Sequence, residues 1–195
     1  MNAIISYIVK MSPYMLIAIP IYLIFRIIFL KTKKIGINWY HEAALLVFVV
    51  FIVGLASQTV IPQLEINENG ISIIQNRVHK TNLIPFKVLS ETYTEVFVNG
   101  YVNYFIINFL GNIVMFAPFG LFIPLLWRAS YKTAVLTGFC SSLFIETCQL
   151  FLARGTDVDD LLLNTLGAFV GVLIYKLLYR LCKPLTDKFK ADKPA

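Results

Sequence analysis

Long apolar stretches alternate with short polar connections along the whole chain. Each stretch carries few charges and reaches the roughly 17–25 residues that an α-helix needs to cross the hydrocarbon core of a bilayer. Five stretches have this length: Met11–Leu30, Ala43–Ile61, Tyr101–Trp127, Thr133–Leu152 and Leu161–Leu178. The pattern therefore predicts an all-α fold, a polytopic membrane helix bundle with five transmembrane helices.

The composition agrees with this interpretation. The chain has 195 residues, of which 58% are hydrophobic and 14% are charged, and its mean hydropathy is +0.73. Soluble domains are typically about 45–50% apolar and about one quarter charged. Because a soluble domain of this size could not hide so much apolar surface, the composition excludes that class.

Basic residues gather in three segments of the chain. They lie around residues 26–34, at residues 128–132 and along the tail from residue 180 onward. Since Lys and Arg mark cytoplasmic loops, we expect a protein of the cell membrane with its N-terminus outside and its C-terminus in the cytoplasm. The net charge of +6 then reflects orientation, and we expect no nucleic-acid partner.

Three regions follow from this division of the chain. Residues 1–39 form an N-terminal transmembrane helix with a basic cytoplasmic loop, and residues 40–180 form the main helical membrane domain. Residues 181–195 form a basic cytoplasmic tail, which we expect to be disordered.

The outer connection, residues 62–100, is too long for a plain connector. Asn69-Gly70 lies between apolar flanks and predicts a β-hairpin. Residues Phe86–Val98 carry apolar side chains at a spacing that fits a helix on the membrane surface. A plain loop is the alternative for this second segment.

Spans three, four and five carry polar or small residues at helical spacing, so that each set shares one helix face. The three sets are Asn108 and Asn112; Ser142, Glu146 and Gln149; and Asp160, Asn164, Gly167 and Gly171. At 1.5 Å of rise per residue, these faces reach roughly 6–10 Å below the outer ends of their spans. We therefore expect one shared polar pocket that opens outward, and we expect the glycines to let the fifth span press against the other two.

Glu146 is the sharpest candidate for chemistry. An ionisable side chain within a membrane span is expensive and is a functional candidate by default. Glu146 could serve as a general acid or base. The alternative is structural: it pairs with Arg154, or hydrogen-bonds to Asn108 or Asn164, and holds the helices together.

The loop between spans four and five, residues 153–160, is the second polar feature. Asp157 or Asp159 could cap the fifth span, where aspartates complement the positive end of the helix dipole. Alternatively, Arg154 forms a fork for a phosphate or carboxylate, and an aspartate such as Asp157 or Asp160 orients it. A calcium site from the aspartates is a further alternative, although the full ligand spacing is missing.

Cysteine and histidine spacing does not point to a metal. The three cysteines form no C-x-x-C pattern, and His41 and His79 lie far apart. We expect no metal and no cofactor. Glu146 is thus the candidate catalytic residue, and the candidate ligand-binding residues are Asn108, Asn112, Gln149, Arg154, Asp157, Asp160 and Asn164.

Four short segments carry a resemblance to a known family. They read NLIPF at residues 82–86, NFLGNIVMFAPFG at 108–120, ETCQ at 146–149, and RGTDVDD followed by NTLG within 154–167. Together, and in this order, they are similar to the VanZ-like family of bacterial membrane proteins. The resemblance spans roughly residues 40–178 and does not include the first span.

The resemblance implies an envelope protein. Founding members of the family are associated with low-level resistance to teicoplanin, a glycopeptide that binds cell-wall precursors outside the cell. Our first hypothesis is an outward pocket that binds a cell-wall precursor, a lipid-linked headgroup or the glycopeptide itself, with membrane lipid as the constant partner. An intramembrane hydrolase or transferase is the second hypothesis. There Glu146 would be the acid/base, the two asparagines of span three would stabilise an oxyanion, and Arg154 would hold a phosphate.

A transporter or assembly partner is the third hypothesis. Five spans without an internal repeat do not favour a transporter that works alone. The oligomeric state is left open by the sequence.

Overall fold

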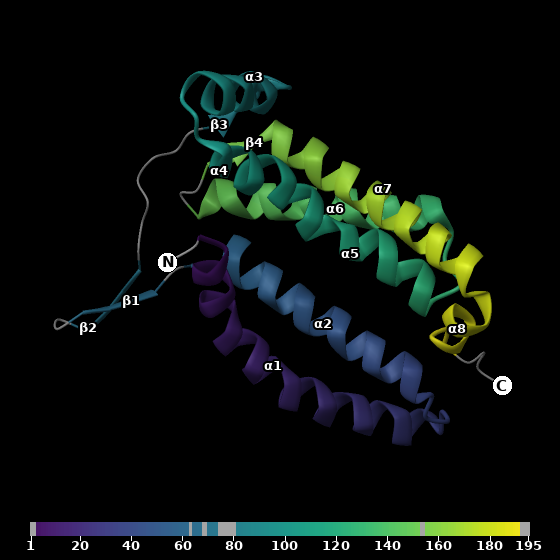
Figure 1. The fold of residues 1–195 in the computed structure, drawn as a ribbon. Coiled ribbons are helices and arrows are strands. Elements are labelled where there is room, and N and C mark those ends of the chain that lie inside the picture. The colour runs from purple at the N-terminus through teal and green to yellow at the C-terminus, as the bar shows by residue number, and fades with distance from the viewer. Residues whose placement is uncertain (1–2, 63, 68–69, 74–80, 153–154, 192–195) are drawn as a thin grey trace. The chain divides into compact units, whose positions relative to one another are not determined.

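The structure is a computed structural model that describes residues 3–62, 64–67, 70–73, 81–152 and 155–191. Helix dominates this part of the chain, and five helices are long and apolar enough to cross a membrane (Figure 1). They are α1 (Ala3–Lys33), α2 (Trp39–Thr59), the helical segment Phe105–Leu126, α6 (Tyr131–Phe151) and α7 (Val158–Leu181). The predicted class, an all-α multi-pass membrane protein, is confirmed.

The third span does not begin as a regular α-helix. A short helix, α4 (Val102–Tyr104), leads into a π-helical turn, η2 (Phe105–Leu110), and then into α5 (Gly111–Leu126). Such turns are rare and frequently occur at functional sites. Asn108 lies within η2, a position that the apolar spacing did not predict.

The outer connection contains the two elements that its sequence predicts. β1 (Leu64–Asn67) pairs antiparallel with β2 (Gly70–Ile73), which confirms the hairpin strands, while its residues 68–69 lie outside the described residues. α3 (Lys87–Tyr93) continues into a π-helical turn, η1 (Thr94–Val98). The helix predicted in this region is therefore confirmed, and the plain-loop alternative is wrong.

Contacts divide the chain into two compact units, and each is described by itself. Unit 1 comprises residues 1–61, 125–128 and 177–195, and unit 2 comprises residues 62–124 and 129–176. α5 and α7 run through unit 2 and end with residues that belong to unit 1.

In unit 1, α1 and α2 meet through long side chains. A Cβ placed on Gly54 of α2 would meet the flexible ends of Met11 and Met15 of α1. Arg26 and Glu42 join the same two helices by two charge-assisted hydrogen bonds of 2.7 Å each. Arg26 therefore pairs with the Glu42 carboxylate. It is also one of the basic residues from which the membrane orientation is predicted.

The segment after α7 is ordered in unit 1. Helix α8 (Lys183–Lys188) follows α7, and the N–H of Ala191 donates to the carbonyl of Leu126 at 2.9 Å. The expectation of a disordered tail is wrong for residues 183–191. The segment is held by hydrogen bonds from Asn38, the N-cap of α2, and from His41 within α2. The basic composition of the segment does not reveal these partners.

In unit 2, α7 approaches its neighbours so closely that only glycine fits. A Cβ on Gly171 would lie 1.9 Å from the carbonyl oxygen of Ala117 in α5, and Gly167 meets the same helix one turn earlier. A Cβ on Gly138 of α6 would lie 2.5 Å from the Cβ of Ala168 in α7. The prediction that small residues bring the fifth span against the third and fourth is confirmed.

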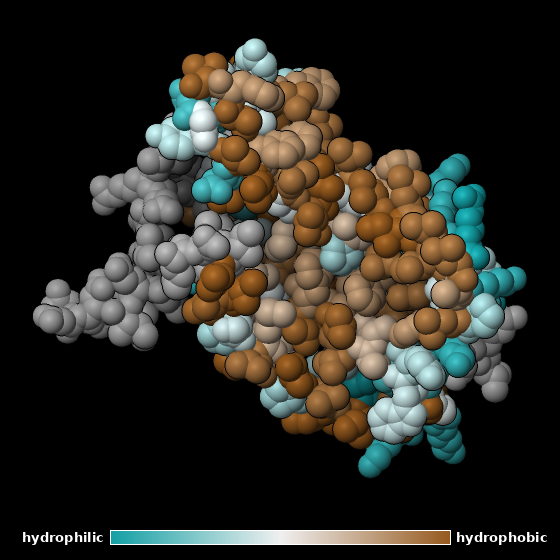
Figure 2. All heavy atoms as spheres, in the orientation of Figure 1, coloured by the Kyte–Doolittle hydropathy of each residue, from teal (hydrophilic) through white to brown (hydrophobic). Residues whose placement is uncertain are grey.

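Apolar side chains also cover the outer surfaces of the helices. In Figure 2 they are the brown spheres that lie over the spans. Lipid tails are as apolar as these side chains, so such exposure is expected for membrane-spanning helices and not for a water-soluble surface.

Candidate functional site

Polar contacts converge where the fourth span ends and the fifth begins. Two short strands, β3 (Thr81–Asn82) and β4 (Thr156–Asp157), pair in parallel there. Asp157 Oδ1 accepts hydrogen bonds from Asn82 Nδ2 at 2.8 Å and from the N–H of Asp159 at 2.9 Å. The second bond caps α7 and confirms that Asp157 serves as its N-cap.

Asp159 fixes the start of α3 from a distance. One carboxylate oxygen accepts from the N–H of Phe86 at 2.5 Å and the other from the N–H of Val88 at 2.7 Å. The residue that precedes α3, Phe86, has a left-handed backbone with φ of 65° and offers no side-chain cap, a conformation that costs a non-glycine residue energy. Asp159, which is only 2% exposed, supplies the missing acceptors.

Asp160 and Asn112 link the fifth span to the third. Asn112 Nδ2 donates to Asp160 Oδ1 at 2.5 Å and to the backbone carbonyl of Asn108 at 3.1 Å. The two predicted polar faces therefore meet. Asn108 takes part through its backbone, and it lies half-buried in η2.

Glu146 links the fourth span to the loop. Its side chain is 7% exposed, and Oε2 accepts from the N–H of Asp157 at 3.1 Å. The predicted pairing with Asn164 is wrong: Asn164 Nδ2 donates to Ser142 Oγ at 2.9 Å, one helical turn from Glu146. Asn164 Oδ1 is buried and has no hydrogen-bond partner among the described residues.

The network is rich in carboxyl groups. Glu146 and Asp160 both lie near enough to Asp157 to experience its charge. In the described part of the chain, no Lys or Arg forms an ion pair with these carboxylates. Arg154, the cation expected here, lies outside the described residues.

Two further sequence predictions concern the edge of the network. Gln149 lies half-buried on α6, three residues after Glu146. No three His, Cys, Asp or Glu side chains within the described ranges are placed to hold a metal ion. The oxygens of the three aspartates bind backbone amides and Asn side chains.

A family described as VanZ/LLP1 matches residues 42–179. The chain belongs to the VanZ/LLP1 family. The four segments that carry the resemblance are thus joined in space: Asn82 bonds to Asp157, Glu146 to the N–H of Asp157, and Asn112 to Asp160. No curated protein and no solved structure matches the chain.

The VanZ/LLP1 match contains every described residue of this network, and it leaves out α1 and the segment after residue 179. Sequence reasoning missed Asn82 and Asp159 as members of the site. Asn82 stands in the NLIPF segment, so the resemblance itself was the available signal. The sequence assigns Asp159 to the cap and dipole of the fifth span or to the calcium alternative, and no local pattern indicates that its carboxylate faces α3.

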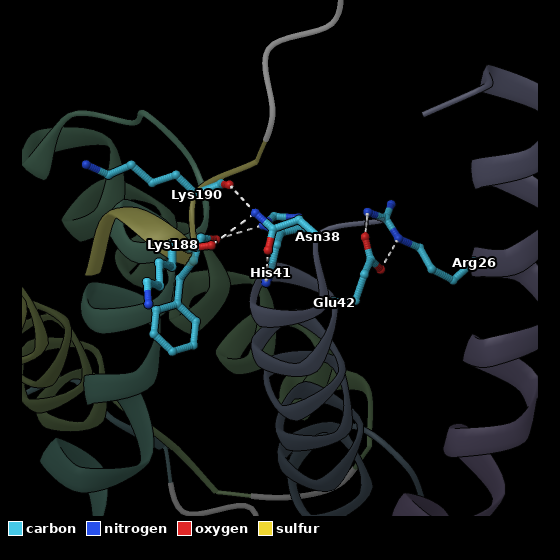
Figure 3. A network of polar contacts seen from close by, with 7 residues as sticks. Arg26, Asn38, His41, Glu42, Lys188 and Lys190 are labelled. Carbon is cyan, nitrogen blue, oxygen red and sulfur yellow. Dashed lines mark hydrogen bonds and ion pairs between the residues drawn. The ribbon is translucent and has the colours of Figure 1, made fainter. Parts of the chain in front are cut away.

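A second polar network lies in unit 1 and draws on residues at both edges of the VanZ/LLP1 match (Figure 3). Asn38 Nδ2 donates to the carbonyls of Lys188 and Lys190, at 3.0 and 3.3 Å. His41 Nδ1 lies 2.9 Å from the carbonyl of Phe189, and because a carbonyl only accepts, Nδ1 carries the proton. We call these contacts the tail clamp.

Proposed function

We propose that this VanZ/LLP1 protein is a bacterial cell-envelope protein that binds a polar headgroup outside the cell and lowers the action of teicoplanin-type glycopeptides. The headgroup would belong to a cell-wall precursor or another lipid-linked molecule, or the ligand would be the glycopeptide itself. One observation carries the proposal: the four family segments join at a single network of carboxylates and amides at the start of α7.

Energetics support a functional role for the charges. Carboxylates at the end of membrane spans are costly unless they are paired and fully hydrogen-bonded. Asp159 accepts two short hydrogen bonds from backbone N–H groups, whereas the Glu146 carboxylate accepts one bond, at 3.1 Å, in the described structure. A ligand that brings hydrogen-bond donors would complete the coordination of such a group.

The proposed ligand contacts follow from chemistry. Asp157 and Asp160 would accept from hydroxyl and amide groups of the headgroup, and Gln149 would accept or donate. Asn108, Asn112 and Asn164 would complete the set. Arg154 would hold a phosphate or carboxylate by two parallel hydrogen bonds. Together these side chains would line a polar pocket that opens outward.

The proposal requires the network to face outward. From the basic segments we infer a cytoplasmic C-terminus and an N-terminus outside the cell. A membrane-impermeant thiol reagent on intact cells tests this with single cysteines at Glu91 and at Lys188. Labelling at position 91 alone is expected, and labelling at position 188 alone would reverse the orientation and remove the proposal.

The proposed function is tested by three variants that each remove one charge from the site. Asp160→Asn and Asp157→Asn retain an acceptor oxygen, and Arg154→Ala removes the proposed fork. Glu91→Gln on the exposed face of α3 is the matched control, because it also removes one negative charge. We expect lower teicoplanin tolerance for the first three at unchanged membrane abundance. Unchanged tolerance in all three would overturn the proposal.

The burial of Glu146 favours a second candidate, an intramembrane hydrolase or transferase in which Glu146 is the acid/base. Ser142 does not fit as its nucleophile, because it is fully buried and bonded to Asn164. Glu146→Gln separates the two candidates. Retained tolerance would exclude acid/base chemistry, while loss of tolerance together with retained precursor or glycopeptide binding would favour the enzyme.

A further inference from the structure

The outer connection exposes a continuous set of large apolar side chains. Six of them lie on and just before α3 and η1, and each is between 48% and 75% exposed: Leu83, Ile84, Phe86, Leu89, Tyr93 and Phe97. We call this set the α3 apolar face. Residues 86, 89, 93 and 97 follow helical spacing, and the rings of Tyr93 and Phe97 contact each other at a tilt of 37°, with centroids 5.3 Å apart. Figure 2 shows brown side chains over this helix.

The opposite sides of α3 are different in character. Val88 is 9% exposed and faces the protein, where Asp159 holds its N–H. Lys87 and Glu91 form an exposed ion pair at 3.4 Å on the edge between them. The segment is thus amphipathic around its axis, with an inner side, a charged edge and a free apolar face.

We propose that the α3 apolar face lies in the membrane interface and contacts the acyl chains of lipid. A patch of this kind is unusual on a surface that faces water. Amphipathic helices that lie in the interface place aromatic and aliphatic side chains at the boundary of headgroups and acyl chains.

The position of α3 identifies lipid as the occupant. Asp159, the second residue of α7, holds the start of α3 with two hydrogen bonds, so α3 lies beside the point where a membrane span begins (Figure 1). The apolar surface also continues along the chain into the third span through exposed side chains of Tyr101, Val102, Ile106 and Leu110. Tyrosines at such a boundary are typical of the aromatic belt of membrane proteins.

This assignment gives α3 a physical role that does not depend on the proposed function. Lipid contact on one side and Asp159 on the other would hold α3 flat at the membrane surface. The charged pair of Lys87 and Glu91 would then remain in contact with water and headgroups.

Tryptophan fluorescence tests the proposal on the full-length protein in phosphatidylcholine vesicles. Phe97→Trp and Tyr93→Trp report on the α3 apolar face, and Glu91→Trp on the charged edge is the matched control. Subtraction of the wild-type spectrum removes Trp39 and Trp127, and thermal unfolding checks that each variant folds. Quenchers are lipid brominated in its acyl chains and, separately, iodide present on both sides of the membrane.

We expect brominated lipid to reduce the added emission of Phe97→Trp by about twofold or more, with iodide nearly without effect. The control should respond in the opposite way. If iodide quenches Phe97→Trp and Tyr93→Trp as strongly as the control, the face is in water and the proposal is overturned. Shielding from both quenchers would also overturn it, because a second copy of the protein, not lipid, would then cover the face.

Discussion

The two units solve the same problem with opposite chemistry. The ends of helices leave backbone groups without partners, N–H groups at the start and carbonyls at the end. In unit 2, the carboxylates of Asp157 and Asp159 accept from N–H groups at the starts of α7 and α3. In unit 1, the tail clamp uses Asn38 and His41 to donate to the carbonyls of Lys188, the last residue of α8, and of Phe189, the residue after it.

The carboxyl groups of unit 2 differ in how many partners they have. Neutral side chains make the contacts of the tail clamp, and both carboxylate oxygens of Asp159 accept from backbone N–H groups. The carboxyl groups of Glu146 and Asp160 accept one hydrogen bond each in the described structure. These two carboxylates are therefore the strongest candidates for a role beyond folding.

The two units also differ in what their helices touch. In unit 2 the backbones of α5 and α7 touch at glycines, whereas α1 and α2 of unit 1 meet at Gly54 through methionine side chains. Backbone cannot move aside without displacing a whole helix, but a methionine can adopt another rotamer. Four substitutions test these differences between the units.

The largest effect is expected for Gly171→Ala. The new Cβ would lie 1.9 Å from the carbonyl of Ala117, so α7 must shift and carry Asp160 away from Asn112. We expect a loss of about 3 kcal/mol in the free energy of unfolding in detergent. Thermal or denaturant unfolding measures it.

Gly54→Ala is the matched control in unit 1. Its Cβ would lie 2.9 Å from the terminal methyl of Met11, which can move, and we expect a change of less than about 1 kcal/mol. Equal losses in the two variants would show that the units do not differ in the rigidity of their helix contacts.

Asp159→Ala is expected to have the second largest effect. It leaves the N–H groups of Phe86 and Val88 without their acceptor and should cost about 2 kcal/mol. Hydrogen exchange at these two amides should rise together. Asp159→Asn keeps one acceptor oxygen and should lose less; if it were as unstable as the alanine variant, charge and not hydrogen bonding would hold α3.

Features that depend on residues close together in the sequence could be predicted from it. Hydropathy over some twenty positions gave the spans, and helical spacing placed Asn112, Asp160 and Glu146 on faces that do meet. Partners that lie far apart could not be predicted. Asp159 contacts amides 71 and 73 positions away, and no spacing rule relates them.

The C-terminal segment likewise depends on partners far away in the sequence. Its basic composition is typical of a disordered segment, and its order depends on Asn38 and His41, which lie 148 or more positions away. The π-helical turn that holds Asn108 was missed because apolar spacing does not distinguish one inserted residue from a regular helix.

His41→Phe should have a smaller effect than either change in unit 2. It keeps a ring beside Trp127 and removes the donor to Phe189, which should cost about 1 kcal/mol. Trypsin cleavage after Lys188 and Lys190 in detergent should therefore become about fivefold faster. Tyr40→Phe, which keeps the ring contact with Phe189, is the control and should cleave at the wild-type rate.

Asp187→Asn should have the smallest effect, visible only as a change with pH. Asp187 accepts a hydrogen bond from Lys190 at 2.5 Å, and this bond, with the charges of Lys190, Lys183 and Arg128, lowers the pKa of Asp187 below 3.8. Because the folded pKa is the lower one, the contact stabilises the fold above the ordinary pKa. That stabilisation is lost as the pH falls through the folded value.

From about pH 6 to about pH 3, the unfolding temperature of the wild type should therefore fall slightly more than that of Asp187→Asn. High salt should reduce the difference, because the pair is exposed and screened. Identical pH profiles at low salt would show that the aspartate adds nothing to the tail clamp. The hydrogen bonds that Asn38 and His41 donate to backbone carbonyls would then be sufficient to hold this segment.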